Sequence, residues 1–336
     1  MEVVLEFADK FVSQLQSPAL AFLLAGFAAA ALGSKIHIPG AINQFTVFML
    51  LMAIGLRAGT EIREGNILEM AVPALFSSVL GACIVLLGSI TLARLPGVRR
   101  EDALATSGLF GAVSASTMAA AILALEEAGI FVEAWVAALY PFMDIPALIL
   151  AIVLANIWVH KQKGDEGSDP SVASIAKDSL RGSALTALLA GVAIGLLTQP
   201  SRVVDEFYDP LFLGFLSILM FTLGIDAFKE IRELLKVAHW YALYAFVGPV
   251  VHGLMGFGLG YIAHMLVGLS PGGVIMLAVL AASNSDVSGP PTLRAGIPSA
   301  NPSTYLGTST GVGTPVAIAI CIPLFIALGK TVFPDI

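Results

Sequence analysis

The sequence predicts an all-α polytopic membrane protein with ten transmembrane helices in a 5+5 inverted repeat, two of them discontinuous. Three observations predict this fold class. Of 336 residues, 57% are hydrophobic and only 12% are charged, about half the charge of an ordinary globular chain. The apolar character, a mean hydropathy of +0.89, extends along the whole chain, and short motifs of the first half recur in order in the second. This composition excludes a soluble enzyme, and a net charge of −7 without a basic cluster excludes a nucleic-acid partner.

Each predicted helix corresponds to one apolar run that is long enough to cross a bilayer. Short polar or Pro/Gly-rich connections separate the runs. The N-terminal segment lacks the basic region and cleavage site of a secretory signal, so we expect the first helix to be retained. Cys83 and Cys321 lie inside apolar runs and are interpreted as small buried hydrophobic residues. The runs span residues 17–34, 41–57, 67–95, 102–126, 133–160, 178–198, 211–228, 238–268, 271–288 and 311–330.

A solvated segment divides the chain into a first repeat, 1–160, a cytoplasmic linker, 161–177, and a second repeat, 178–336. When the loops alternate across the membrane, twelve of the 17 Lys and Arg residues fall on one side and five on the other. The positive-inside rule places the first group in the cytoplasm. Both termini are therefore expected outside it.

The inverted repeat is predicted from matches between the halves. The tetrapeptide EIRE at 61–64 returns at 230–233, an offset of 169. Five helices per half force the second copy to be inverted, and such repeats are typical of secondary transporters with a site near the membrane centre. An old duplication in a channel or an enzyme is the alternative. The same offset relates Gly55 to Gly224, Ser114 to Ser283, Ser116 to Ser285 and Pro146 to Pro315, whereas LLAG at 23–26 returns at 188–191 with an offset of 165.

The fourth and ninth runs contain polar clusters that predict breaks at membrane depth. The fourth reads GLFGAVSASTMAAAI, and the ninth reads AASNSDVSGPPTLRAG. Consecutive prolines cannot continue a helix but suit the start of a new one. Two helix N-termini that converge from the inverted halves present free N–H groups and partial positive charge, which favours a small oxyanion. Helix packing by small residues is the alternative interpretation.

Asp144 and Asp286 are carboxylates within predicted spans, where a free charge is costly. With no basic residue in the same span as Asp144, a bound cation such as Na⁺ or H⁺ is the expected partner. A protonated structural aspartate or a helix cap is the alternative. Hydroxyls in GTSTGVGTP of the tenth span suit a hard cation or helix packing. We interpret Arg57 and Asp226, which share a repeat position, as interfacial residues.

Several segments resemble the cyanobacterial sodium-dependent bicarbonate transporter family, SbtA, over residues 8–328: SPALAFLLAGFAAAALGS, FGAVSASTMAAA, ALYPFMDIPAL and SDVSGPPTLRAGIPSANPSTYLG. The resemblance implies Na⁺/HCO₃⁻ symport for a carbon-concentrating mechanism, a homotrimer in the plasma (inner) membrane, and a cytoplasmic PII-like inhibitor, SbtB. The linker at 161–177 is shorter than in many members of the family. The resemblance places substrate binding at Gly111, Ser114, Ser116, Thr117, Ser283, Asn284 and Ser285, and sodium binding at Asp144, Asp286, Ser288, Thr308 and Thr310.

Three other functions remain open from the residues alone. Helix N-termini do not tell oxyanions apart, so a Na⁺ symporter of another small anion, such as a carboxylate, is the closest. An intramembrane aspartyl protease would use Asp144 and Asp286 as its dyad, but its expected sequence contexts are missing. A passive anion channel is disfavoured only by the buried carboxylates. If a regulator binds, we expect Arg99, Arg100, Lys229 and Lys236 to attract it.

Overall fold

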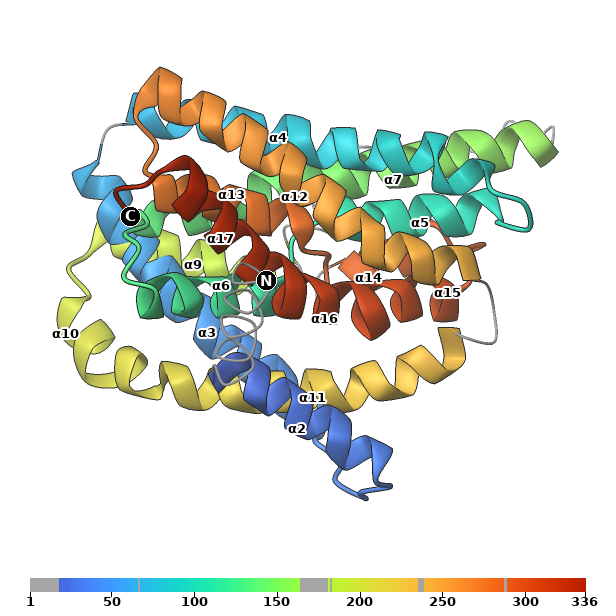
Figure 1. Ribbon diagram of the computed structural model, residues 1–336, viewed down its shortest axis with the longest axis horizontal. Helices are drawn as coiled ribbons and strands as arrows, with labels where there is room; N and C mark the ends of the chain where they lie inside the picture. Colours follow the sequence, from blue (N-terminus) through green and yellow to red (C-terminus); the bar gives the residue numbers. More distant parts are fainter. Residues whose placement is uncertain (1–17, 66, 164–180, 182, 235–238, 287–288) are drawn as a thin grey trace, which may run out of the picture.

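The computed structural model describes residues 18–65, 67–163, 181, 183–234, 239–286 and 289–336 (Figure 1). Within these ranges every regular element is a helix and none is a strand. The α-helices are α2 (Pro18–Ala31), α3 (Gly40–Glu64), α4 (Ile67–Ile90), α5 (Arg100–Gly111), α6 (Ala115–Glu127), α7 (Tyr140–Lys163), α9 (Ser183–Leu197), α10 (Ser201–Val203), α11 (Asp209–Leu234), α12 (His239–Val267), α13 (Pro271–Ala282), α14 (Gly289–Gly296), α15 (Pro302–Leu306), α16 (Thr314–Val316) and α17 (Ile322–Val332). Short 3-10 turns are η1 (Leu92–Arg94) and η2 (Ala134–Leu139), and π-helical segments are η3 (Val204–Tyr208), η4 (Gly307–Gly313) and η5 (Ala317–Cys321).

The described helices confirm a polytopic membrane protein. In lipid the backbone must satisfy its own hydrogen bonds, so apolar runs of this length form helices. Seven helical segments of the described chain are long and apolar enough to span a membrane: Gly40–Glu64, Glu69–Arg94, Arg100–Glu127, Ala134–Val159, Ser201–Lys229, His239–Val267 and Pro302–Val332. Shorter apolar helices cover Leu20–Ala31, Thr186–Leu197 and Pro271–Ala282. Each of these segments overlaps one predicted apolar run. Most of the predicted linker, from residue 164 onward, lies outside the described residues.

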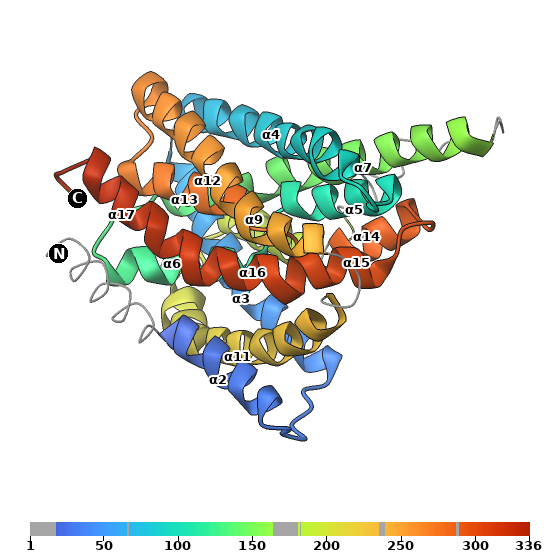
Figure 2. The same ribbon diagram turned by 45° about the vertical axis from the view of Figure 1, so that its right-hand side comes forward.

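The helices pack in two groups. The small bundle contains α2, α3, α9, α10, η3 and α11, with α2 packed on α11 and α9 packed on α3. The large bundle contains α4 to α7 and α12 to α17, in which α4, α5 and α7 contact one another and α12 packs on α13. Figure 2 shows α2 and α11 below the large bundle, which α4 and α12 cover from above. The bundles meet mainly where α11 contacts η4 and α3 contacts η2.

Glycines permit the closest helix contacts of the small bundle. A Cβ at Gly224 of α11 would overlap the carbonyl of Leu23 on α2, and Gly26 of α2 faces α11 equally closely. Gly55 of α3 and Gly191 of α9 form a second crossing, where a Cβ on either would lie 3.0 Å from the Cα of the other. Lipid provides little hydrophobic drive between helices, so close backbone contact of this kind stabilises their association.

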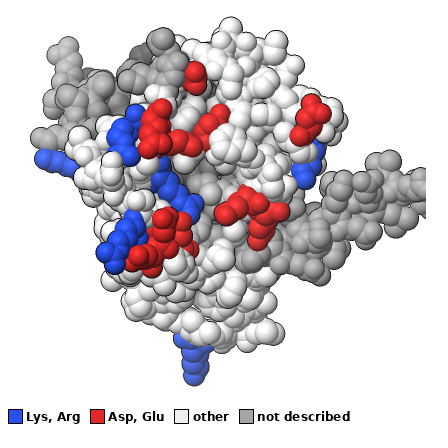
Figure 3. Space-filling view, turned by 90° about the vertical axis from the view of Figure 1, so that its left-hand side faces the viewer, with Lys and Arg blue, Asp and Glu red and all other residues white. Residues whose placement is uncertain are grey.

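Charged side chains gather at one end of the molecule. Figure 3 faces the end where α3 passes to α4 and where α10 lies, and it shows acidic and basic groups together on a surface that is otherwise uncharged. Ion pairs at this end join Arg57 to Asp209 and Arg202 to Glu206, with N–O distances of 2.5 and 3.1 Å. The sides of the bundle instead expose apolar residues such as Leu75 and Leu213. A charged end between apolar sides is the surface expected of a protein that crosses a membrane.

Candidate functional site

Both predicted breaks are present as interruptions between helices. In the fourth run, α5 ends at Gly111 and α6 begins at Ala115. Ser114 caps α6, because its Oγ accepts the N–H of Thr117 at 3.0 Å. In the ninth run, α13 ends at Ala282, and α14 begins at Gly289 with two prolines in its first turn. Ser and Pro thus start the second half-helices as their local preferences predict.

The two breaks contact each other directly. The N–H of Ser114 donates to Oγ of Ser283 at 3.1 Å, so the two serines related by the sequence offset meet. The N–H of Ser285 donates to the carbonyl of Leu109 at 2.8 Å, and its Oγ accepts the N–H of Gly289 at 2.8 Å. Ser114, Ser283 and Ser285 are completely buried. The structure therefore brings predicted substrate residues of both halves, Ser114 with Ser283 and Ser285, into one buried region.

Asp286 connects the second break to the start of α6. Its Oδ2 accepts a hydrogen bond from the hydroxyl of Ser116, and the carboxylate lies beside the Ser114 hydroxyl and the Ala115 N–H. The hydroxyls of Ser114 and Ser116 lie 2.9 Å apart. A carboxylate of the chain itself thus occupies part of the helix N-terminus at which an external oxyanion was expected.

Asp144 contacts the first break from α7. It is fully buried, and its Oδ1 accepts the backbone N–H of Val113, in the break, at 3.1 Å. Sequence reasoning named a bound cation as the expected partner of Asp144 and did not foresee this backbone donor. The carboxylate therefore has a structural role at the break, while its role in sodium binding stays a prediction.

The tenth run reaches the second break through hydroxyls of η4 and α16. Ser309 and Thr314 both donate to Oδ1 of Asn284, at 2.7 and 2.8 Å. The hydroxyl of Thr308 is instead directed to the carbonyl of Thr304 in its own helix, at 2.6 Å, and Thr310 is half-buried. The two hydroxyls that contact the break are thus those of Ser309 and Thr314, and not those of Thr308 and Thr310, the two residues of this run that were assigned to sodium.

Three buried polar atoms beside the contact between the breaks have no hydrogen-bond partner among the described residues. They are Oγ1 of Thr117, Nδ2 of Asn284 and Oδ1 of Asp286. Buried polar atoms in proteins are nearly always hydrogen-bonded, so such atoms call for a ligand or an ion. Hydroxyl and amide donors next to a helix N-terminus suit an oxyanion, and a carboxylate oxygen suits a cation.

Two assigned residues are placed differently. Gly111 lies in a helix contact, where a Cβ would come within 2.8 Å of the Gly81 carbonyl and 2.9 Å of the Ala147 side chain. Packing accounts for this glycine, and its part in substrate binding stays a prediction. Ser288 lies outside the described residues. No group of three or more His, Cys, Asp or Glu side chains gathers in the described part of the chain, so a cation there would rely on hydroxyl and carbonyl oxygens as well.

Sequence reasoning missed one contributor to the site, Val113, and left two others, Ser309 and Thr314, out of the sodium assignment although their segment had been recognised. Val113 contributes a backbone donor, for which its side chain gives no signal. Ser309 and Thr314 belong to the polar segment that had been recognised, and their spacing of five residues matches the i→i+5 winding of a π-helix. The sequence had singled out both hydroxyls but did not show that this winding places them together.

One comparison identifies the family of the chain. Among curated proteins, no relative matches it. A family model for the Na⁺-dependent bicarbonate transporter superfamily matches residues 18–330, which include both bundles and both breaks. This match confirms the resemblance seen in the sequence. The family consists of transporters and not enzymes, so it excludes an aspartyl protease built on Asp144 and Asp286. The chain belongs to the Na⁺-dependent bicarbonate transporter superfamily.

Proposed function

We propose that the protein is a secondary active Na⁺/HCO₃⁻ symporter that imports bicarbonate by alternating access, for inorganic carbon concentration. The observation that carries the proposal is the buried contact between Ser114 and Ser283, with unpartnered atoms of Thr117 and Asn284 beside it. Bicarbonate is a small planar oxyanion that hydroxyl, amide and helix N-terminal N–H groups can bind without an arginine. Substrate binding is assigned to Gly111, Ser114, Ser116, Thr117, Ser283, Asn284 and Ser285.

The proposed architecture is ten spans in a 5+5 inverted repeat. Figure 1 supports it: α4 runs from left to right and α12 from right to left, and α3 and α11 also run in opposite directions. The two glycine crossings are equivalent under the sequence offsets, because Gly26 with Gly224 corresponds to Gly191 with Gly55. Two halves with equivalent contacts and opposite orientation can form sites that open to either side in turn.

Carboxylates at opposite ends of the large bundle further support this repeat. At one end, Glu133 accepts the N–H of Ser270, which precedes α13, at 2.8 Å. At the other end, Asp102 of α5 accepts the N–H of Asn301, which precedes α15, at 2.7 Å. Under the offset of 169, the pair at positions 133 and 270 corresponds to positions 302 and 101. Each of these is one residue from the second observed pair, Asn301 and Asp102. Each half therefore ties the loop before its last span to the broken span of the other half.

Coupling to Na⁺ follows from the position of Asp286. Without a cation, its carboxylate occupies donors at the α6 N-terminus and repels an incoming anion. A bound Na⁺ would neutralise the carboxylate and draw it toward the ion, which frees these donors for bicarbonate. The ion is assigned to Asp144, Asp286, Ser288, Thr308 and Thr310, with Ser309 and Thr314 as adjacent hydroxyls. In this scheme the coupling ion promotes anion binding because it draws away the Asp286 carboxylate, which otherwise occupies the donors that the anion needs.

The cellular setting is proposed from the family resemblance and the loop charges. We assign the chain to the inner membrane of a cyanobacterium, as a homotrimer in membrane lipid with both termini outside the cytoplasm, regulated by the PII-like SbtB. Two basic residues expected to attract that regulator have internal contacts. Arg99 donates to the Ser299 carbonyl at 2.8 Å, and the guanidinium of Arg100 lies 4.2 Å from the Trp158 ring centre. Both residues therefore help to hold this end of the large bundle, whatever their part in regulation.

Uptake of radiolabelled bicarbonate into proteoliposomes tests the proposed function. We expect an inward Na⁺ gradient to drive accumulation above equilibrium, and an inward K⁺ gradient of equal size to fail. Accumulation without Na⁺ would refute coupling, and equilibration alone in Na⁺ would indicate a channel. Competition by unlabelled acetate or formate that equals competition by bicarbonate would favour a carboxylate as the substrate.

A further inference from the structure

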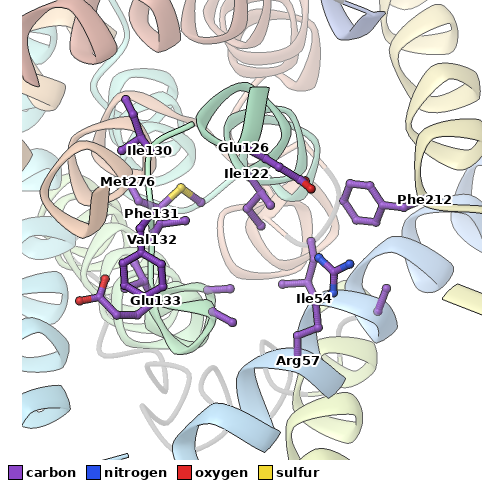
Figure 4. Close-up of a pocket in the computed structure, with 14 residues that line it drawn as sticks. Ile54, Arg57, Ile122, Glu126, Ile130, Phe131, Val132, Glu133, Phe212 and Met276 are labelled. Carbon is purple, nitrogen blue, oxygen red and sulfur yellow. The ribbon is translucent and has the colours of Figure 1, made fainter. Parts of the chain in front are cut away.

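A cavity of about 250 Å³ lies between the two bundles, away from the contact between the breaks. Ile54, Arg57 and Phe212 of the small bundle line one side, and Glu126 and Met276 of the large bundle line the other (Figure 4). Because liquid water occupies roughly 30 Å³ per molecule, the cavity has room for several waters or for small hydrated ions. It lies at the charged end that the positive-inside rule assigns to the outside.

The cavity follows the two half-helices that lead to the breaks. Ile122 of α6 lines it and lies five residues beyond Thr117, about 7.5 Å along a helix. Met276 of α13 also lines it and precedes Ser283 by seven residues, about 10 Å. The start of α6 and the end of α13 are the break ends of these helices, so an ion in the cavity is within about two helical turns of the proposed binding site.

Two opposite charges face this cavity from different bundles. In Figure 4 the guanidinium of Arg57 and the carboxylate of Glu126 both point into the space between α3, α6 and α11. Arg57 contacts Asp209 through one nitrogen at 2.5 Å, and a guanidinium has five N–H donors, so others remain for an anion. Glu133, which also lines the cavity, is already engaged, since Ser270 donates to it from both its N–H and its hydroxyl, at 2.8 and 2.6 Å.

Apolar walls strengthen the field of these two groups. Ile54, Ile122, Phe212 and Met276 surround the charges, and a cleft with low-dielectric walls focuses the potential of its charged residues on entering ions. One cationic and one anionic side chain on opposite walls are complementary to one anion and one cation. On the entry path of a symporter, such a region would raise the local concentration of both ions.

We infer that this cavity is a two-ion entry site in which Arg57 binds the small oxyanion and Glu126 binds the alkali cation before both reach the breaks. The inference rests on the proposed function. It assigns a binding role to two residues at the outer end that sequence reasoning had left without one. Asp209 competes with the anion for the Arg57 guanidinium and so limits how tightly Arg57 retains the anion.

Uptake kinetics of single variants test the assignment. Arg57→Gln should raise the half-saturating bicarbonate concentration about three- to tenfold at saturating Na⁺, and Glu126→Gln should do the same for Na⁺ at saturating bicarbonate. Maximal uptake should stay close to wild type in both. Arg202→Gln and Glu127→Gln, which change like charges outside the cavity, are the matched controls. The assignment would be overturned if either cavity variant raised the half-saturating concentrations of both ions equally, or if it lowered only the maximal uptake rate. Either result would indicate that the residue gates access and does not bind one ion.

Asp209→Asn separates binding from a structural role of the Arg57 ion pair. If Arg57 binds the anion, releasing it from Asp209 leaves the half-saturating bicarbonate concentration unchanged or lower. If the pair merely fixes α3 to α11, Asp209→Asn reproduces the defect of Arg57→Gln, and the inference is wrong.

A chemical readout tests the cavity independently of transport. In a background of Cys83→Ser and Cys321→Ser, Ile122→Cys places a thiol in the cavity. Its modification rates with an anionic and a cationic methanethiosulfonate report the local potential. Arg57→Gln should slow the anionic reagent about threefold or more relative to the cationic one, and Glu126→Gln should do the reverse. An unchanged ratio would overturn the inference even if Na⁺-driven uptake is intact, whereas absent uptake with a shifted ratio would refute only the proposed function.

Discussion

Asp286→Asn is the substitution that tests coupling most directly. In the structure the Asp286 carboxylate accepts the Ser116 hydroxyl and occupies the start of α6. The amide of Asn has nearly the same shape and can keep a hydrogen bond to Ser116, but it carries no charge. The substitution therefore removes the electrostatic competition with the anion while it preserves the contact between the breaks.

The expected magnitude follows from the interactions that the charge adds. A hydrogen bond to a charged group contributes about 1.5–3 kcal/mol, against about 0.5–1.5 for a neutral one, and an anion at a helix N-terminus gains about 0.3–1 kcal/mol. Replacing the carboxylate should thus reduce the cost of displacing it by about 1.5–2.5 kcal/mol, or roughly 10- to 60-fold in affinity. Bicarbonate binding without Na⁺ should tighten by this factor.

Equilibrium binding of radiolabelled bicarbonate to the purified protein, with Na⁺ and with K⁺ in its place, measures this effect. For Asp286→Asn we expect binding in K⁺ to approach that of the wild type in Na⁺, and Na⁺-driven uptake to be lost. Asp205→Asn removes an acidic residue of η3 away from the breaks and should change neither quantity. Weaker bicarbonate binding by Asp286→Asn in K⁺, or an undiminished enhancement by Na⁺, would refute the competition argument.

Three further outcomes are expected. Asp144→Asn keeps an oxygen acceptor for the Val113 N–H, so the protein should remain folded. Na⁺-driven uptake should be abolished, because the charge assigned to Na⁺ binding is removed. Wild-type Na⁺ dependence of uptake in this variant would show that Asp144 does not belong to the sodium site. Asn284→Asp keeps the oxygen acceptor used by η4 but replaces the unpartnered Nδ2 donor with a negatively charged oxygen. Bicarbonate binding should therefore weaken at least about tenfold, a loss of roughly 1.5 kcal/mol or more, while the circular dichroism spectrum stays unchanged. Unaltered bicarbonate binding would contradict the donor role of Asn284. Gly224→Ala should destabilise the protein by about 1–3 kcal/mol in thermal unfolding because its Cβ overlaps α2, whereas Gly214→Ala on the same helix meets no atom within 4 Å and should not; equal effects would show that the crossing tolerates a methyl group.

The helices and their breaks were predictable because they depend on local physics. Apolar runs in lipid form helices, and prolines such as Pro290 suit the first turn of a new helix whatever surrounds them. The contact between Ser114 and Ser283 was also predicted, from the offset that relates the two polar clusters and from the expectation that their helix ends converge. These features need no knowledge of how the chain packs elsewhere.

Individual ligands were less predictable because they depend on helix winding and tertiary packing. Thr308 and Thr310 were assigned from a segment expected to be α-helical, but its winding is π-helical over Gly307–Gly313, which places Ser309 and Thr314 together on the side facing Asn284. The backbone donor that Asp144 binds leaves no mark in the side-chain pattern. Arg57 was interpreted only as an interfacial residue that shares a repeat position with Asp226. Its cavity could not be predicted, because the cavity forms between helices that are far apart in the sequence.

The hydrogen bonds of the large bundle favour motion between the bundles over opening of the breaks. Glu133 with Ser270 and Asp102 with Asn301 tie both ends of this bundle across the halves, and Ser114 with Ser283 ties its centre. Separating the breaks would leave the completely buried Ser114 N–H and Ser283 hydroxyl oxygen without their partner, at about 1–3 kcal/mol for each unsatisfied group. The cavity instead lies between the bundles, where the Glu61 carboxylate of α3 accepts the Trp135 N–H of η2 at 2.7 Å. A half-buried bond of this kind can exchange with water at lower cost, so it is the contact that we expect to change in the proposed alternating access.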